Sequence, residues 1–173
     1  RALHYRLMAA RKADKLCAPW EAVTHYLRSL KLLEQLPETA DRRREFLQIV
    51  LSLTSVRGDY WRNDTEMREA RRIAEKALAV AREMGDVSAV ARLQAFEGNY
   101  WKGEQLLAAA LADAEVSGSD RVQADVASYN ANYLGFVGRF DQALAHTKRV
   151  IQIYEQLGDR SHLGVVLAGS ARC

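Results

Sequence analysis

Apolar side chains recur three and four residues apart along most of the chain, and this spacing predicts helices. The segment 69–84 shows it clearly, because charged residues fill the side opposite an apolar stripe made of Ile73, Ala74, Ala77, Leu78 and Ala81. No window alternates convincingly with a period of two, so strands are not expected. The pattern predicts about nine helices, at 1–16, 19–36, 41–57, 65–84, 87–97, 103–116, 120–137 and 140–157, with another starting at 161.

Three glycines are evenly spaced along the chain, and each is followed two places later by an aromatic residue. They are Gly58, Gly98 and Gly138, and each stands where a helical pattern stops. Glycine tolerates the positive φ that commonly ends a helix, so we interpret the three as turns between the two helices of a hairpin. The loop 59–65 is longer than the other turns, and its Tyr60-Trp61 pair is expected to fold back as a local plug.

A second set of turns alternates with the first. Gly85-Asp86, Gly118-Ser119 and Gly158-Asp159 each combine a glycine that can end one helix with a residue that can cap the next. The alternation predicts hairpins joined in series.

A turn glycine, an aromatic residue and then small residues at fixed offsets resemble the tetratricopeptide repeat. The matching residues are Gly138, Phe140, Ala143 and Val150-Ile151 in one unit, and Gly98, Tyr100, Gly103 and Ala110-Leu111 in another. Earlier units offer Ala22, Tyr26 and Ser29-Leu30, and then Ala70, Ala74 and Ala77-Leu78. Small residues allow the two helices of a hairpin to approach closely at their crossing.

This resemblance implies an all-α fold, a right-handed α-α superhelix (a solenoid) of about four and a half helical hairpins. We expect one domain over 1–173, with units at 1–37, 41–85, 86–118, 119–158 and a partial unit at 159–173. The period set by the three turn glycines is longer than the consensus period of this repeat. The chain also lacks the tryptophan and leucine that the consensus has in the first helix and the proline that it has after the second. These departures resemble the longer repeats of ATPase-linked bacterial adenylate and guanylate cyclases and of maltose-regulator and LuxR-type transcription regulators.

A more particular match supports the cyclase group. The stretches 21–39, 43–47 and 82–86 are similar to the repeat region of bacterial cyclases that carry an ATPase module. The resemblance therefore implies a multidomain bacterial signalling protein as the parent. The start at Arg1 and the end inside an apolar helical pattern also lead us to expect a piece of a longer polypeptide.

Composition narrows the class of protein. Apolar residues make up 49% of the 173 residues and charged residues 27%, which excludes a disordered chain as the default. The net charge of +3 is too small and too mixed to indicate a nucleic-acid partner. No apolar run is long enough to cross a membrane. The two cysteines, Cys17 and Cys173, lie at opposite ends, so we expect a reducing, cytoplasmic setting.

Residue patterns typical of catalysis are not found. The histidines, His4, His25, His146 and His162, have no metal-ligand spacing with acids or cysteines, and no phosphate loop or nucleophile elbow occurs. We therefore expect no catalytic residues, no cofactor and no metal in this domain.

Two basic clusters could meet an anionic partner, but solvated helix faces explain such clusters more often. One is the run 42–44, and the other consists of Arg6, Arg11, Lys12 and Lys15. The Tyr100-Trp101-Lys102 run mixes aromatic and basic groups, and its place at a turn favours packing over single-strand binding.

A column of polar residues is the sharper signal. In this repeat class the first helix of each hairpin lines the concave side, so residues at equal offsets from the turn form a row. At the same offset before each turn stand Arg11, Ser52, Arg92 and Asn132, and one more step of the same spacing leads to Arg172. One turn earlier the face continues with Gln48, Ser88 and Ser128, and Tyr129 and Phe136 are expected to add aromatic surface. Such a groove could hold an extended peptide by its backbone and carboxylates, although a merely solvated face is the alternative.

Together these features predict a non-catalytic interaction or regulatory module that binds a protein or peptide ligand, or neighbouring domains of its own chain, and neither nucleic acid nor membrane. Two alternatives stay open. An effector-sensing arm of a transcription regulator would require an enclosed apolar pocket. A self-assembly module would form a homo-oligomer through its last helix, where Leu163, Val166 and Leu167 are expected to be exposed.

Overall fold

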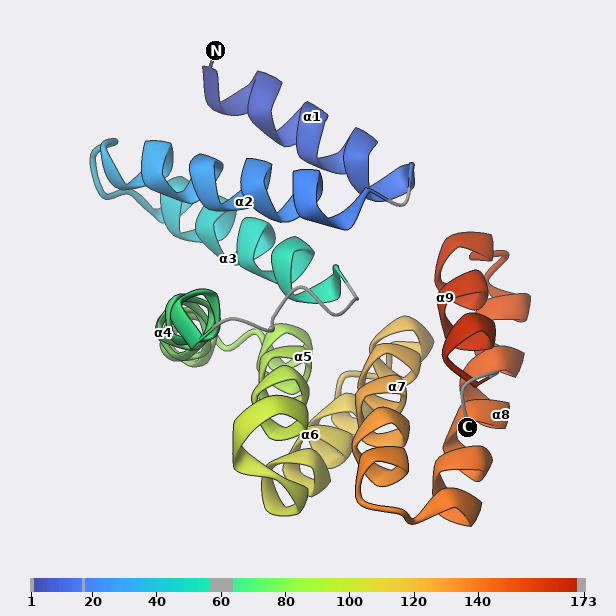
Figure 1. The fold of residues 1–173 in the computed structure, drawn as a ribbon. Helices are drawn as coiled ribbons and strands as arrows, with labels where there is room; N and C mark the ends of the chain where they lie inside the picture. Colours follow the sequence, from blue (N-terminus) through green and yellow to red (C-terminus); the bar gives the residue numbers. More distant parts are fainter. Residues whose placement is uncertain (1, 17, 57–63, 171–173) are drawn as a thin grey trace. The chain divides into compact units, whose positions relative to one another are not determined.

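A computed structural model describes residues 2–16, 18–56 and 64–170, and its regular structure there is entirely helical (Figure 1). The described helices are α1 (Ala2–Lys15), α2 (Pro19–Glu34), α3 (Ala40–Ser55), α4 (Asp64–Glu83), α5 (Val87–Glu97), η1 (Gly98–Lys102), α6 (Glu104–Val116), α7 (Asp120–Phe136), α8 (Phe140–Gln156) and α9 (Arg160–Ser170). The predicted helix boundaries agree with these to within about two residues, except that helical structure continues past the predicted end at 97 through η1. None of the described helices is long and apolar enough to cross a membrane.

The chain forms two compact units, Arg1–Met84 and Gly85–Cys173. In the first unit α1 packs on α2, α2 on α3, and α3 on α4. In the second unit α5 packs on α6, α7 packs on α5, α6 and α8, and α8 packs on α9. Helices therefore pack mainly on their neighbours in the chain, which confirms the expected all-α class with packing typical of helical repeats. The right-handed superhelix and its concave side stay predictions.

Small side chains lie where helices meet. Ala10 of α1 and Ala22 of α2 are fully buried, and the whole apolar stripe predicted on α4 is buried as well. In the second unit Ala124, Ala127, Val150 and Tyr154 form one buried cluster. Burying such side chains contributes roughly 0.8 kcal/mol for each methylene group removed from water.

The turns between successive hairpins follow the sequence prediction. Gly85, Gly118 and Gly158 have φ values of 67°, 64° and 67°. The capping oxygens also accept as expected: Oδ1 of Asp86 accepts from the backbone N–H of Ala89 at 2.9 Å, and Oγ of Ser119 accepts from Val122 at 3.4 Å. These contacts satisfy N–H groups that the helix itself leaves without a partner.

The turns inside the hairpins match the prediction at one position and contradict it at another. Gly138 has the expected positive φ of 81°, and Gly58 lies outside the described residues. Gly98 is helical, with φ −62°, and the chain continues through η1, a π-helical turn, to Gly103, whose φ is 68°. A Cβ on Gly98 would lie 2.8 Å from Cγ of Leu107. Gly98 is therefore needed for close packing against Leu107 of α6, and the turn lies at Gly103.

The even pitch expected from the turn glycines is also wrong for part of the chain. The first helix of each successive pair begins at Ala2, Ala40, Val87, Asp120 and Arg160. The step from Val87 to Asp120 is shorter than the expected pitch, whereas the step from Ala40 to Val87 is longer. Loop length varies freely because doubling a loop costs only about 0.6 kcal/mol.

The plug expected from Tyr60 and Trp61 falls outside the described residues.

Candidate functional site

The polar column predicted from the sequence spans the full range of exposure. Arg11, Gln48, Asn132 and Phe136 are exposed, Ser52, Ser88 and Arg92 are half-buried, and Ser128 and Tyr129 are buried. Arg172 lies outside the described residues. The expectation that Tyr129 adds aromatic surface is wrong, because its ring packs against Phe96 with the centroids 6.2 Å apart.

In the first unit two of the predicted residues lie close to one phenol. Tyr26 of α2 is buried, and Ser52 of α3 and Arg11 and Asp14 of α1 are near enough to influence the pKa of its phenol. Burial, with the negative charge of Asp14, raises the pKa of the Tyr26 phenol above its ordinary value. The raised pKa favours the neutral phenol, which lies near side chains of α1 and α3.

In the second unit Arg92 is paired inside the fold. Its Nε lies 3.1 Å from Oδ2 of Asp125 on α7, and Asp125 is only 5% exposed. The hydroxyl of Tyr154 on α8 donates to Oδ1 of Asp125 at 2.7 Å, and Nε of Arg121 donates to the same oxygen at 3.3 Å. One buried carboxylate thus joins α5, α7 and α8.

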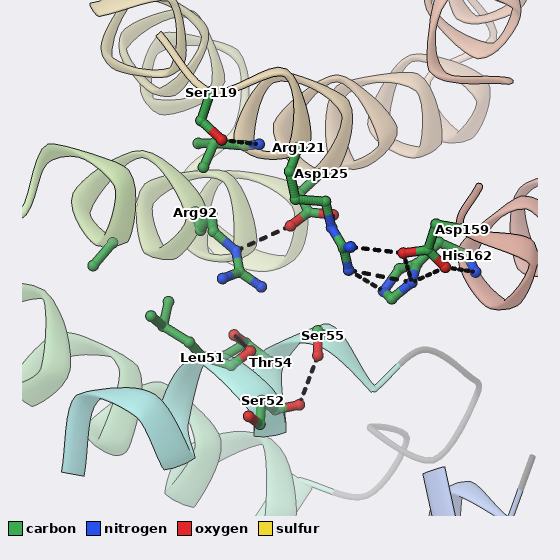
Figure 2. A network of polar contacts seen from close by, with 12 residues as sticks. Leu51, Ser52, Thr54, Ser55, Arg92, Ser119, Arg121, Asp125, Asp159 and His162 are labelled. Atoms are coloured by element: carbon green, nitrogen blue, oxygen red, sulfur yellow. Dashed lines mark hydrogen bonds and ion pairs between the residues drawn. The ribbon is translucent and has the colours of Figure 1, made fainter. Parts of the chain in front are cut away.

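The same network reaches α9 (Figure 2). Nη1 of Arg121 lies 2.6 Å from Oδ2 of Asp159, and Asp159 accepts from the backbone N–H of His162 at 3.1 Å, as an N-cap does. The His162 ring lies 3.0 Å from the Asp159 carboxylate and 5.4 Å, between centroids, from the Tyr154 ring. Burial alone would raise the pKa of Asp159, but the hydrogen bonds from His162 and the charges of His162 and Arg121 lower it below its ordinary value.

A regular offset explains why these pairs form. Arg92 meets Asp125, Phe96 meets Tyr129, and Nδ2 of Asn132 donates to Oδ1 of Asn99 at 3.1 Å. Each pair is separated by the 33 residues that also separate the starts of α5 and α7. Three residues of the predicted column, Arg92, Tyr129 and Asn132, are therefore each paired with a residue outside that column. The row of donors along a concave side stays a prediction.

Sequence reasoning missed the apolar part of the surface around one of its predicted residues. Phe136, at the end of α7, is 91% exposed, and Phe140 and Leu144 on α8 are 60% and 52% exposed. Val137, between the two helices, is also exposed. The density of apolar residues from 136 to 144 is visible in the sequence and could have indicated this patch.

The apolar residues expected to be exposed at the last helix behave differently. Leu163 and Val166 pack against the buried cluster of Ala124, Ala127, Val150 and Tyr154, so their predicted exposure is wrong. Leu167 is exposed, as expected.

The carboxylates of the network are paired within the chain. Asp125 and Asp159 face arginines and hydrogen-bond donors of the chain itself. No group of three or more His, Cys, Asp or Glu residues in the described part of the chain could hold a metal ion. His146 forms a 3.1 Å contact with Asn130, and burial, together with the charge of Arg149, lowers its pKa. The charged and polar groups therefore pair with one another and hold neighbouring helices together.

The comparisons with known proteins add no family. No protein-family model matches the chain, and no curated protein matches it.

Proposed function

We propose that this chain is a non-catalytic helical-repeat module that binds a peptide segment of a partner protein at the C-terminal end of α7. The observation that carries the proposal is the 91% exposure of Phe136, followed closely in the chain by three further exposed apolar residues at 137, 140 and 144. Scattered single apolar residues are normal on a surface, whereas a cluster is typical of an interaction site. Phe136 also belongs to the face that the sequence predicted for binding.

The asparagine pair beside Phe136 favours an extended peptide as the ligand. Asn132 lies one helical turn before Phe136, so both side chains leave the same side of α7. The bond between Asn132 and Asn99 uses one amide hydrogen and one carbonyl oxygen, and the other oxygen and hydrogens of the pair remain to bond a ligand. An extended peptide backbone offers complementary donors and acceptors, and its apolar side chain would cover Phe136.

The charges near this surface support an apolar and amide-based contact. Arg139, at the turn between α7 and α8, forms an ion pair with Glu104 of α6. Its charge is therefore already compensated within the chain. Within a larger signalling protein, as the cyclase-type resemblance implies, the peptide would belong to a neighbouring domain or to a partner.

Selection from a random peptide library displayed on phage tests the proposal. The chain serves as bait, and the Phe136→Ser variant serves for counter-selection. Enriched sequences should carry an aromatic or aliphatic residue, and one of them is then synthesised with a fluorophore and titrated by fluorescence anisotropy. We expect Phe136→Ser to weaken binding about tenfold or more, because burying a phenylalanine contributes roughly 1.5–3 kcal/mol. Asn132→Ala should weaken it a few-fold, in line with about 0.5–1.5 kcal/mol for a hydrogen bond.

Val116→Ser is the matched control. Val116 is 75% exposed at the end of α6 and lies outside the proposed surface. Its substitution should leave the affinity unchanged. Failure to enrich any sequence, or equal affinity for wild type and Phe136→Ser, would refute the proposal.

A further inference from the structure

The outer face of α1 carries exposed apolar residues at helical spacing. Tyr5 and Met8 of α1 are 68% and 54% exposed, and Leu16, in the turn just after the helix, is 68% exposed. Lys12 lies between Met8 and Leu16 at the same spacing. Residues three, four and seven apart share one face of a helix. The opposite face of α1, with Leu3, Leu7 and the buried Ala10, is more covered and packs on α2. The outer stripe is thus distinct from the core-facing side.

Basic residues are concentrated on the same helix. Arg11, Lys12 and Lys15 are exposed, and in the described part of the chain no carboxylate pairs with them within 4.0 Å. The other basic cluster behaves differently. In the run 42–44 each arginine has a carboxylate partner, such as Asp41, which lies 3.0 Å from Arg44. Positive side chains that lack a carboxylate partner on one helix face are complementary to a negatively charged partner surface.

We propose that the outer face of α1 docks an acidic amphipathic helix of a partner protein. Such a helix would place apolar side chains against Tyr5, Met8 and Leu16 and carboxylates beside Lys12 and Lys15. A membrane surface fits less well, because the residues of α1 that could form a broad apolar face pack on α2. This surface lies in the first compact unit, and the inference is independent of the peptide site at Phe136.

Synthetic helical peptides serve as the probe. One peptide carries leucine at a helical spacing of three and four and glutamate elsewhere, and its counterpart has lysine in place of glutamate. Each is labelled with a fluorophore and titrated with the chain by anisotropy at low and high salt. The acidic peptide should bind, the basic one should not, and added salt should weaken binding because it screens exposed charges.

Charge reversal tests the location. Lys12→Glu with Lys15→Glu should weaken binding of the acidic peptide about tenfold or more, and Met8→Ser should weaken it without changing the salt dependence. Lys148→Glu with Arg160→Glu is the matched control, because it makes the same change in net charge on α8 and α9 at exposed positions. The control and Phe136→Ser should both bind as wild type does, provided that circular dichroism shows unchanged helicity in every variant.

Several outcomes would overturn the inference. The acidic peptide could fail to bind, or bind the α1 variant and wild type equally. Phosphatidylserine-containing vesicles could bind in its place and lose binding on charge reversal of α1, which would assign the face to a membrane. Self-association in the ultracentrifuge that Met8→Ser abolishes would assign it to a second copy of the chain.

Discussion

Asp125 is expected to be the residue whose loss most weakens the second compact unit. It is buried, accepts from Tyr154 at 2.7 Å and lies 3.1 Å and 3.3 Å from arginines on α5 and α7. Removing one partner of a buried ion pair costs about 3–5 kcal/mol, because the other charge is left uncompensated. Arg92 and Arg121 are 25% and 41% exposed, so water screens part of that cost. We therefore expect Asp125→Asn to lower the free energy of unfolding by about 2–3 kcal/mol.

Urea unfolding together with hydrogen exchange measures this loss. Because the chain has two compact units, a single unfolding curve can mix two transitions, and exchange resolved by segment separates them. Exchange should accelerate in α5, α7, α8 and α9 and stay unchanged in α2 and α3. Tyr154→Phe should cause a smaller loss, about 1.5 kcal/mol, because it removes one hydrogen bond to a charged group.

The matched control is an ion pair on the surface. Nε of Arg71 lies 3.0 Å from the Glu75 carboxylate on α4, and both side chains are about half exposed. Exposed pairs contribute about 0–1 kcal/mol, so Arg71→Gln should change stability little. If Asp125→Asn lowers the free energy of unfolding no more than Arg71→Gln does, the network does not hold the helices together and the reasoning fails.

Two further predictions concern packing and pH. Gly98→Ala should destabilise the chain by about 1–3 kcal/mol, because its Cβ would press on Leu107, whereas Gly164→Ala, with open space around its Cβ in α9, should stabilise it by up to about 1 kcal/mol; thermal unfolding of both variants checks this. The lowered pKa of Asp159 means that its contribution to stability is present above its unfolded pKa of about 4 and is lost as pH falls through the folded value. Urea unfolding of Asp159→Asn should therefore show a deficit at neutral pH that shrinks as the pH falls below the ordinary pKa of an aspartate, and a deficit that stays constant on acidification would contradict the assignment.

The helices and the turns between hairpins were predictable because their signals are local. Periodicity of three and four residues marks a helix wherever one face is buried. A glycine followed by Asp or Ser supplies both a left-handed turn and a cap within a few residues, as at Gly85-Asp86. Neither signal depends on what the rest of the chain does.

The register between α5 and α7 was not predictable from the glycines chosen. Gly98 and Gly138 each precede an aromatic residue by two places, yet one is needed for contact with Leu107 and the other for its positive φ. A sequence does not distinguish these two uses of glycine. The capped turns at Gly85 and Gly118 give the correct interval between α5 and α7, because they fix where each first helix begins.

The π-helical turn explains how the spacing of the glycines and the spacing of the helix starts coexist. If the chain had turned at Gly98, Asn99 would have left the helix and its bond to Asn132 could not have formed. By continuing to Lys102, the first helix becomes long enough to run beside the 17 residues of α7, so that pairs can form at three successive levels. π-helical turns are rare and occur mostly as single turns within helices, and this one begins at Gly98, which approaches Leu107 closely. The same extension places the asparagine pair beside Phe136, so the local irregularity that misled the sequence prediction also shapes the proposed binding surface.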